Sequence, residues 1–453
     1  MQLESLAEIK TPGLIQTLQI INNPIKFLEQ RANRCRETFT VRVMGFNSPP
    51  VVFFSNPQAI KEIFTLPVEK VDFQQATHVF KPLMGEKSVI LQEGNSHNRQ
   101  RQLLMPQFHG DRMKDYGSII CQITEQVTQQ WLPGSTISIN QFMPDITLQI
   151  ILQVVFGIEP SERYQKLRKL LSSLLDDITN PWYSSLFFFP PLQRDLGKWS
   201  PWGNFLKRRQ QIDDLIYAEI SQRRLENNNS RTDILSMLMS ACDNNGQQMT
   251  DIELRDQLVS LLLLGYETTA ATLAWAFYLI YSSPNVCNKL NQELDTLGKN
   301  SQPDRIANLP YLSAVCQEIL RIHPIALICV PRMVKELVKI QEHTFSAGTI
   351  LVPCIYLAHR REETYPQPEQ FAPERFLDRK FSPYEYLPFG GGSRGCIGAA
   401  FAIYEMKLII ATVMSHWQMK LAQTKAVKPI RRGITITPSG GVKMRIADKQ
   451  RNN

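Results

Sequence analysis

The chain has 453 residues, of which 43% are apolar and 20% are charged, and this composition is ordinary for a globular protein with a large core. No linker rich in proline, glycine or serine divides it, so we expect one domain over residues 1–453. The formal net charge is +8, but the basic residues are dispersed along the chain. This pattern argues against nucleic acid as a partner and favours docking of an acidic protein.

The eight cysteines are scattered without a Cys-x-x-Cys pair, which is typical of a protein in a reducing cytosol. An acid, Glu4, stands where a signal peptide has a basic start. We find no run that approaches the ~18 apolar residues of a membrane span. The sequence therefore predicts a cytoplasmic protein without a transmembrane segment, and we expect a monomer.

Two strand-like runs lie near the N-terminus, at residues 38–43 and 51–54, and they predict a small sheet at one edge of the fold. Further along, residues 94–108 carry His97 and Arg101, which are four residues apart and therefore share one face of a helix. Such a face could bind a pair of carboxylates, and a solvated basic helix face is the alternative.

Residues 115–245 predict a succession of amphipathic helices in which we identify no chemistry. Proline and aromatic residues interrupt this pattern between residues 182 and 202. An apolar loop of this kind would suit an apolar ligand or contact with a membrane surface, and packing in the core is an equally good interpretation.

A capping box at Thr250–Glu253 opens a helix that can continue to Ser283, a length of about 50 Å. Apolar residues surround its middle on every side, which predicts burial, yet the polar run Glu267–Thr269 interrupts them. Buried polar groups need partners. The threonine hydroxyls can bond to the preceding turn and, with Gly265, loosen the helix and admit water; a satisfied hydrogen bond in the core is the alternative.

Glu318 and Arg321 share a helix face because they are three residues apart, although a Glu-x-x-Arg pair is common by chance. Strand-like runs follow at residues 334–340 and 349–357. Residues 434–446 predict a hairpin at the C-terminal end.

The most informative stretch is residues 389–398, Phe-Gly-Gly-Gly-Ser-Arg-Gly-Cys-Ile-Gly, which precedes an apolar helical run from Ala399 to Val413. Cys396 is thereby placed at a helix N-terminus, where unpaired N–H groups and the helix dipole favour a thiolate and lower the pKa of the thiol. The glycines let a flat, wide group approach the backbone. An inert cysteine in a buried turn is the alternative.

Five motifs, in the same order along the chain, resemble those of the cytochrome P-450 superfamily. The glycine-rich loop matches Phe-x-x-Gly-x-Arg-x-Cys-x-Gly, and the long helix matches Ala/Gly-Gly-x-Asp/Glu-Thr-Thr/Ser except at Leu264, where the family has a small residue. A leucine there would narrow the pocket or shift the substrate. The other matching residues are Phe389, Gly392, Arg394, Cys396 and Gly398 in the loop, Gly265, Glu267, Thr268 and Thr269 in the helix, Glu318 and Arg321, Arg375 of a Pro-x-Arg-Phe segment, and His97 with Arg101.

The resemblance implies a mainly α (α+β) cytochrome P-450 fold with a large helical lobe and a small β-rich lobe, to which residues 1–80 and 325–380 contribute. It implies haem b as cofactor, with the Cys396 thiolate as the axial ligand of the haem iron. The other implied roles are propionate binding by His97, Arg101, Arg332 and Arg394, further cofactor contacts at Phe389 and Gly398, proton delivery by Glu267 and Thr268, a substrate pocket at Leu261, Leu264 and Gly265, and a buried charge network of Glu318, Arg321 and Arg375.

The reaction that the resemblance implies is activation of O2 and insertion of one oxygen atom into an apolar substrate. The chain has no flavin or nicotinamide fingerprint, so electrons from NAD(P)H would arrive through a separate ferredoxin or flavodoxin with its reductase. The chain looks closest to soluble bacterial members, including cyanobacterial ones, that oxidise terpenes, long-chain fatty acids or alkanes. A peroxide-driven peroxygenase and a non-catalytic haem gas sensor or carrier are the alternatives, and the pair Glu267–Thr268 argues against both.

Overall fold

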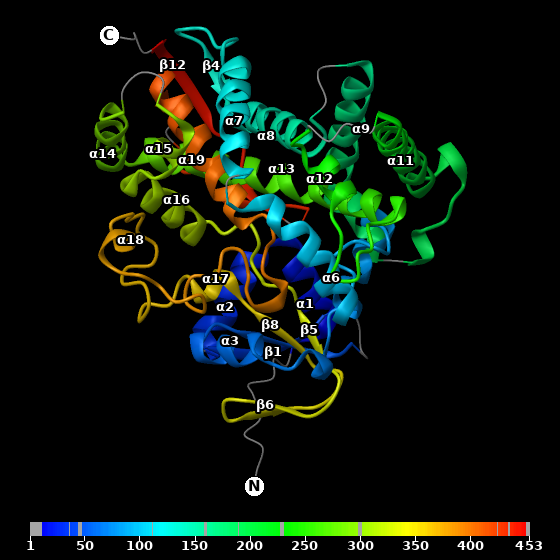
Figure 1. Ribbon diagram of the computed structural model, residues 1–453. Coiled ribbons are helices and arrows are strands. Elements are labelled where there is room, and N and C mark those ends of the chain that lie inside the picture. The colour runs from blue at the N-terminus through cyan, green and yellow to red at the C-terminus, as the bar shows by residue number, and fades with distance from the viewer. Residues whose placement is uncertain are drawn as a thin grey trace.

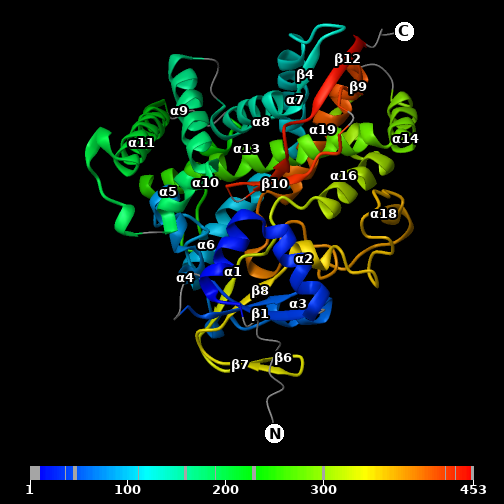
Figure 2. The ribbon, with the colours of Figure 1, turned by 180° about the vertical axis from the view of Figure 1, so that it is seen from behind.

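A helix of 32 residues, α13 (Asp251–Ser282), crosses the middle of the protein, and a lobe that contains a sheet lies below it in Figure 1. The computed structural model describes residues 11–35, 37–43, 48–110, 112–157, 161–188, 190–226, 231–297, 301–423, 425–433 and 435–449. In this part of the chain, a large lobe of helices lies against the smaller, sheet-containing lobe (Figures 1 and 2). The predicted mainly α fold with a small β-rich lobe is therefore confirmed.

The long helices belong to the large lobe, whereas the sheet-containing lobe holds short helices and the first two helices of the chain. The helices other than α13 are α1 (Gly13–Asn22), α2 (Pro24–Cys35), α3 (Pro57–Phe64), α4 (Gln74–Thr77), α5 (Lys81–Met84), α6 (Gly94–Leu104), α7 (Arg112–Thr128), α8 (Ile139–Phe156), α9 (Glu162–Thr179), α10 (Pro181–Ser184), α11 (Pro201–Glu226), α12 (Ile234–Ser240), α14 (Pro284–Asp295), α15 (Pro303–Ala307), α16 (Pro310–Ile322), α17 (Ile355–Ala358), α18 (Arg375–Asp378) and α19 (Ala399–His416).

The small lobe is built on a five-stranded sheet with the order β1-β2-β8-β5-β3, in which β2 and β8 are parallel and the other neighbours are antiparallel. Its strands are β1 (Thr38–Arg42), β2 (Pro50–Phe54), β3 (Val71–Asp72), β5 (Arg332–Val334) and β8 (Ile350–Pro353). A three-stranded sheet has the order β4-β12-β9, and β6–β7 and β10–β11 form hairpins. These strands are β4 (Thr136–Ser138), β6 (Val338–Ile340), β7 (His343–Phe345), β9 (Trp417–Leu421), β10 (Pro429–Arg432), β11 (Thr435–Pro438) and β12 (Lys443–Lys449).

Both faces of the five-stranded sheet are covered, which explains the continuous apolar run in β2. Neighbouring residues of a strand point to opposite faces. Val51 and Phe53 therefore join the apolar cluster on the side of α2, whereas Val52 and Phe54 join the cluster on the side of α3. Phe39 of β1 is the register partner of Phe53, and their rings stack with centroids 5.2 Å apart.

The hairpin predicted over residues 434–446 is wrong. β11 pairs with β10, whereas β12 pairs with β4 and β9 in a different sheet. Gly440 and Gly441, which separate β11 from β12, have φ angles of +69° and +73°, so the chain leaves β11 instead of folding back along it. Ile434 lies outside the described residues.

The capping box predicted for α13 is present. The Thr250 hydroxyl accepts a hydrogen bond from the Glu253 N–H at 3.3 Å, and the Glu253 carboxylate accepts one from the Thr250 N–H at 2.9 Å. The helix then packs against α8, α11, α16, α19 and β11. This enclosed position explains why most of its length is apolar on all sides.

Three helices, α8, α13 and α19, are long and apolar enough to cross a membrane by length and composition alone, so the expectation that no segment meets this criterion is wrong. Between 61% and 72% of their apolar windows are buried inside the protein. α13 packs against both α8 and α19, and a helix enclosed in this way needs apolar residues on all its faces.

Two isoleucines of α13 test how much this packing contributes. Ile280 is fully buried and Ile252 is 57% exposed. We expect Ile280→Ala to lower the free energy of unfolding by about 2–5 kcal/mol, because it removes apolar contacts and leaves a cavity. The matched variant Ile252→Ala should change it by less than about 0.5 kcal/mol. Denaturant unfolding of both variants measures the difference, and equal losses would contradict the burial of α13.

Candidate functional site

The loop that carries Cys396 folds back on itself directly before α19. The Cys396 N–H donates to the Phe389 carbonyl at 2.9 Å, and Gly390 and Gly392 adopt φ angles of +68° and +64° that favour glycine. Cys396 lies three residues ahead of Ala399, where α19 begins. The predicted position of Cys396 at a helix N-terminus is confirmed.

The predicted fall in the pKa of the Cys396 thiol is wrong for the protein without a metal. Burial among protein atoms raises this pKa, and the Gly398 N–H and the Arg101 guanidinium only oppose that effect. The side chain is nevertheless accessible, and a Cβ atom built on Gly398 would meet no other atom within 4 Å. Space for a flat group therefore lies beside the loop, as the glycine pattern predicts.

Glycine is also required on the other side of the loop. A Cβ atom on Gly391 would lie 2.2 Å from a ring carbon of Phe64, a distance at which the ring would have to move. The ring of Phe64 in turn lies beneath the Arg332 guanidinium, 4.8 Å from its carbon. The loop and the end of α3 thus approach closely because residue 391 has no side chain.

The four predicted propionate-binding residues come from three elements and gather around this loop. His97 and Arg101 lie on α6, Arg332 on β5, and Arg394 in the loop itself. The Arg101 Nη1 donates to the carbonyl of Gly395, next to Cys396, at 2.7 Å.

The partners of the other two arginines are backbone carbonyls and rings. The Arg332 Nη1 donates to the Val330 carbonyl at 3.0 Å, and the Arg394 guanidinium donates to three carbonyls of residues 89–92. Phe73 lies under both guanidinium groups, 5.3 Å from that of Arg332 and 4.3 Å from that of Arg394. The Arg394 Nε is buried without a hydrogen-bond partner among the described residues.

In the part of the chain that the structure describes, these cations lack a close carboxylate partner, although the more distant charge of Glu93 acts on Arg394. Among the described residues, no salt bridge joins Arg101, Arg332 or Arg394 to a carboxylate. Burial lowers the pKa of Arg332 and of Arg394 to about 10 each, and burial followed by the charge of Arg394 lowers that of His97 to about 4. An anionic group would relieve this burial cost, so the residues present fit a ligand that has two carboxylates, as haem has.

A stripe of partly accessible residues interrupts the otherwise buried middle of α13. Leu261, Leu264, Gly265 and Thr268 follow the three-to-four-residue spacing of one helix face. The Thr268 hydroxyl donates to the Leu264 carbonyl at 2.7 Å, and the Thr269 hydroxyl donates to that of Gly265 at 3.0 Å. The structure thus places the three predicted pocket residues and Thr268 on one face.

The expected loosening of the helix at Gly265 is not observed. α13 stays α-helical from Asp251 to Ser282. A Cβ atom at residue 265 would lie 3.2 Å from the Cδ1 of Ile151 on α8, which is closer than most real Cβ contacts. Glycine at this position therefore allows α8 and α13 to pack closely.

Glu267 precedes Thr268 on α13 and lies near Thr435 of β11. Its Oε1 atom is buried without a partner among the described residues, and its carboxyl is within hydrogen-bond reach of the Thr435 hydroxyl. Burial raises the pKa of Glu267 to about 7, against a smaller opposing effect of Arg432. A carboxyl with this pKa can both take up and release a proton near neutral pH.

The predicted charge network is assembled completely. Arg321 donates from Nε and Nη2 to the two oxygens of Glu318 at 2.7 and 2.8 Å, and neither side chain is exposed. Arg375 donates from Nε to the Glu318 Oε1 at 3.1 Å, and so does the backbone N–H of Ala372 at 3.0 Å.

A histidine that the sequence analysis missed joins this network to the cysteine loop. The Arg321 Nη1 donates to the His359 carbonyl at 2.8 Å, and the His359 Nε2 accepts from the Leu387 N–H at 3.0 Å. Nδ1 of the neutral ring then donates to the Arg321 carbonyl, 3.2 Å away. Leu387 precedes Phe389 by two residues, so the network reaches the start of the loop. Nothing in the sequence around His359 distinguishes it from an ordinary core histidine.

Part of the segment between residues 182 and 202 packs in the core, as one of the two interpretations predicts. The rings of Phe187, Trp202 and Phe205 form a buried cluster with centroids 5.0–5.7 Å apart. Trp199, in contrast, is exposed. Phe189 lies outside the described residues.

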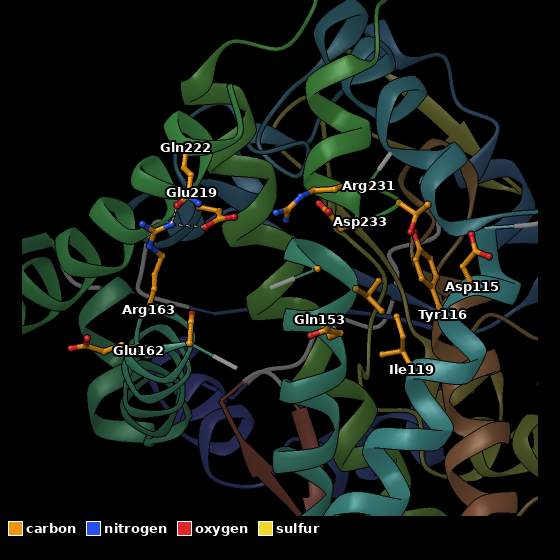
Figure 3. Close-up of a pocket in the computed structure, with 14 residues that line it drawn as sticks. Asp115, Tyr116, Ile119, Gln153, Glu162, Arg163, Glu219, Gln222, Arg231 and Asp233 are labelled. Atoms are coloured by element: carbon orange, nitrogen blue, oxygen red, sulfur yellow. Dashed lines mark hydrogen bonds and ion pairs between the residues drawn. The ribbon is translucent and has the colours of Figure 1, made fainter. Parts of the chain in front are cut away.

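A polar hollow of about 810 Å³ lies elsewhere, between α7, α8, α9, α11 and α12 (Figure 3). Figure 3 shows Arg163 pointing towards Glu219 and Gln222, to which it donates at 2.7 Å each. The hollow includes neither the cysteine loop nor the accessible stripe of α13. Among its charged groups, Arg163 pairs with Glu219, Arg231 with Glu226 and Asp233 with Arg223, and we assign the hollow no ligand.

Comparison with known proteins agrees with this geometry. The family model described as Cytochrome P450 matches residues 10–444. A protein of Mycobacterium tuberculosis named "Putative cytochrome P450 135B1" is 32% identical over 435 residues, which cover 96% of this chain and 89% of the relative. A second, "Putative cytochrome P450 135A1" of the same organism, is 32% identical over 446 residues, 98% of this chain and 95% of the relative.

Two solved structures share the fold. "Retinoic acid bound cyanobacterial CYP120A1" superposes with a TM-score of 0.85 at 22% identity and covers 99% of this chain and 100% of its own. "Crystal structure of cytochrome P450DA heme domain" gives a TM-score of 0.84 at 19% identity, with coverage of 99% and 98%.

This chain therefore belongs to the cytochrome P450 family, and it is a haem-dependent monooxygenase. The family assignment also implies the use of O2, electron transfer from a redox partner and an apolar substrate.

The buried position of Glu318 predicts a large effect of a small change. Glu318→Gln removes the negative charge that compensates Arg321, so we expect a loss of about 3–5 kcal/mol in the free energy of unfolding and a loss of haem. The control is Glu374→Gln, the same change in an exposed pair with Lys289, which should cost less than about 1 kcal/mol. Denaturant unfolding and haem content measure both. If the two variants behave alike, the network does not hold the loop.

The pKa of Glu267 predicts a pH-dependent stability. In the unfolded chain this carboxyl ionises near its ordinary value of 4.5, whereas in the folded protein it stays protonated up to about pH 7. Its contribution is therefore fully present below about pH 4.5 and is lost as the pH rises through about 7. We expect Glu267→Gln to raise the melting temperature relative to the wild type at about pH 8 and not at about pH 4.5. Parallel melting curves across this range, as expected for the control Glu342→Gln at an exposed site, would contradict a raised pKa.

Proposed function

We propose that this monooxygenase binds haem b with Cys396 as the axial iron ligand and oxidises a terpene, a long-chain fatty acid or an alkane. The observation that carries the proposal is a group of buried or partly buried arginines, without a salt bridge among the described residues, beside an accessible cysteine. Arg332 and Arg394 meet carbonyls and rings but, among the described residues, no carboxylate. A ligand with a metal centre and two carboxylates satisfies both features at once.

Each group of residues then has a defined part. His97, Arg101, Arg332 and Arg394 would bind the propionates, and Phe389 and Gly398 would contact the haem from the loop. When bound, the haem supplies activation of O2 by electrons, and a thiolate ligand donates electron density that favours O–O cleavage. Glu318, Arg321 and Arg375 keep the loop in register.

Proton supply is assigned to α13. Glu267 has a pKa near neutrality and releases a proton towards Thr268 on the accessible stripe. The Thr268 hydroxyl donates to the Leu264 carbonyl in the structure, so its oxygen is free to accept that proton's hydrogen bond. Removal of either residue would leave the electron supply intact and divert oxygen to peroxide.

The substrate class follows from the apolar character of the stripe. Leu261 and Leu264 offer partly accessible hydrocarbon on the face that bears Thr268, which supports an apolar substrate and gives no hydrogen bond to a polar one. Leu264, where the family has a smaller residue, narrows this face and favours a slender chain or an isoprenoid. Separate ferredoxin or flavodoxin proteins would carry the electrons from NAD(P)H, and the net charge of +8 suits acidic partners. The cytoplasmic location and the monomeric state stay predictions.

The test is an optical titration of the purified ferric holoprotein with a sesquiterpene hydrocarbon and, separately, a long-chain fatty acid. We expect the reduced, carbon monoxide-bound protein to show thiolate ligation, and one of the two ligands to shift the ferric haem from low to high spin. A shift with the terpene alone indicates terpene oxidation, and a shift with the acid alone indicates fatty-acid oxidation. Native protein without thiolate ligation would overturn the role of Cys396, and normal ligation with neither shift would overturn both substrate classes.

A further inference from the structure

Glu93 directly precedes α6, but its carboxylate binds the start of another helix. The Glu93 Oε1 accepts from the Phe73 N–H at 2.6 Å and from the Gln74 N–H at 2.8 Å, where α4 begins. The side chain makes no capping hydrogen bond to α6, all of whose residues the structure describes, whereas the Glu93 carbonyl accepts from the His97 N–H at 3.2 Å. The Glu93 Oε2 is 3.9 Å from the Lys335 Nζ. Glu93 therefore joins the first turn of α6, which carries His97, to the start of α4.

The ring of Phe73 contacts two of the arginines assigned to the propionates. β5 is antiparallel to β3, and Arg332 lies opposite Phe73 when the register of the two strands is continued by one residue. The ring centroid of Phe73 is 5.3 Å from the guanidinium carbon of Arg332 and 4.3 Å from that of Arg394, distances at which a cation and a ring attract each other. Phe73 is only 5% exposed, so water weakens this attraction little. One ring thus contributes to the position of both cations.

The residues just before Glu93 bind Arg394 as well. The Arg394 Nη1 donates to the two carbonyls of residues 89–90 at 3.3 and 3.4 Å, and the Arg394 Nη2 donates to the Gln92 carbonyl at 2.6 Å. The contacts form a closed set, because the carbonyls next to Glu93 bind Arg394, the Glu93 carboxylate binds the backbone of Phe73, and the Phe73 ring lies against Arg394. Each member limits the movement of the others, so the direction of the guanidinium is determined before an anion binds.

We propose that Glu93 is a positioning residue of the haem site and that it orients the propionate-binding cations through Phe73. The carboxylate fixes the start of α4, the Phe73 ring then holds Arg332 and Arg394, and the Glu93 carbonyl fixes the turn of α6 that carries His97. A carboxylate suits this position because it forms strong, charge-assisted bonds with backbone N–H groups and leaves the guanidinium groups available to a ligand. The inference rests on the proposed binding of the propionates and deepens it, since it names a residue that acts through the cations.

The test compares haem with haem dimethyl ester, whose propionates are esterified and carry no charge, while the ring and the metal are unchanged. The full chain is loaded with one or the other, and the rate at which each leaves for an excess of apomyoglobin is followed by absorbance. In the wild type we expect the ester to leave at least about tenfold faster, because it makes no charge-assisted bonds with the arginines. The ratio of the two rates isolates the propionate contacts, since a general loosening of the protein speeds both releases alike.

Two variants break the proposed set of contacts, and a third preserves it. Glu93→Ala removes the acceptor and Phe73→Leu removes the ring, and each should lower the ratio of ester to haem release rates by about three- to tenfold. Glu93→Gln keeps an oxygen that can accept from both N–H groups, so its ratio should equal that of the wild type.

Two control variants make the same changes elsewhere in the fold. The Glu293 carboxylate also accepts from two backbone N–H groups, those of Tyr311 and Leu312, at 2.7 and 2.8 Å. Phe345 is a buried ring of the small lobe and is 4% exposed. Glu293→Ala and Phe345→Leu should lower the melting temperature and leave the ratio of release rates unchanged.

An unchanged ratio in Glu93→Ala or in Phe73→Leu would overturn the role of Glu93, provided that the wild type distinguishes haem from the ester. A ratio in Glu93→Gln as low as in Glu93→Ala would also overturn it, because the two hydrogen bonds would then not be the cause. A fall in the control variants would show that the ratio reports general destabilisation, and the proposal would fail. Equal release of haem and ester from the wild type would instead overturn the propionate assignment of the proposed function, and the role of Glu93 would fail with it.

Discussion

The buried ion pair between Glu318 and Arg321 is the interaction on which the candidate site depends. Two charges without any exposure are stable only when each is hydrogen-bonded on all sides. Glu318 is saturated by Arg321, Arg375 and a backbone N–H, and the remaining Arg321 donors reach backbone carbonyls. His359 accepts hydrogen bonds both from Arg321 of α16 and from the Leu387 N–H, so it links α16 to Leu387. The network is thereby hydrogen-bonded to the chain two residues ahead of Phe389, where the loop that bears Cys396 begins.

The site itself has the opposite character, because its charges are left without compensation. Arg332 and Arg394 are held by carbonyls and by the ring of Phe73, so their positions are defined before any anion binds. Burial lowers their pKa values, and it raises that of the Cys396 thiol. Both pKa shifts show that burial disfavours the charged form, which is the guanidinium for the arginines and the thiolate for Cys396. One ligand with a cationic centre and an anionic edge would stabilise both charged forms. Pre-positioned donors of this kind reduce the cost of ordering side chains on binding.

α13 combines two tasks that conflict in their chemical demands. As the central core helix it must be apolar on all sides, yet the site requires a hydroxyl and an acid within reach of the same face. The conflict is resolved by local bonds, since Thr268 and Thr269 donate to carbonyls one turn earlier. Glu267 forms no such bond with the preceding turn, and burial raises the pKa of its carboxyl to about 7.

Local patterns in the sequence were sufficient for the features that depend on a few neighbouring residues. The capping box at Thr250, the strands of residues 38–42 and 50–54, the place of Cys396 ahead of α19 and the threonine bonds within α13 follow from periodicity, capping and glycine conformation. The group of side chains around the loop could be predicted only because the whole set of motifs resembles a known family.

Tertiary structure alone decided the features that depend on residues far apart in the chain. Burial raises the pKa of the Cys396 thiol against the opposing effects of the Gly398 N–H and of Arg101, and the number of protein atoms around a thiol cannot be read from its neighbours in sequence. β11 pairs with β10 and not with β12. Gly265 allows the close packing of α13 against Ile151 of α8. The sequence around His359 and Thr435 does not identify them as part of the site. His359 matters through its hydrogen bond with Leu387, and Thr435 through its proximity to Glu267. Charge, packing and hydrogen bonding across such distances are determined by the folded arrangement, and not by the local sequence.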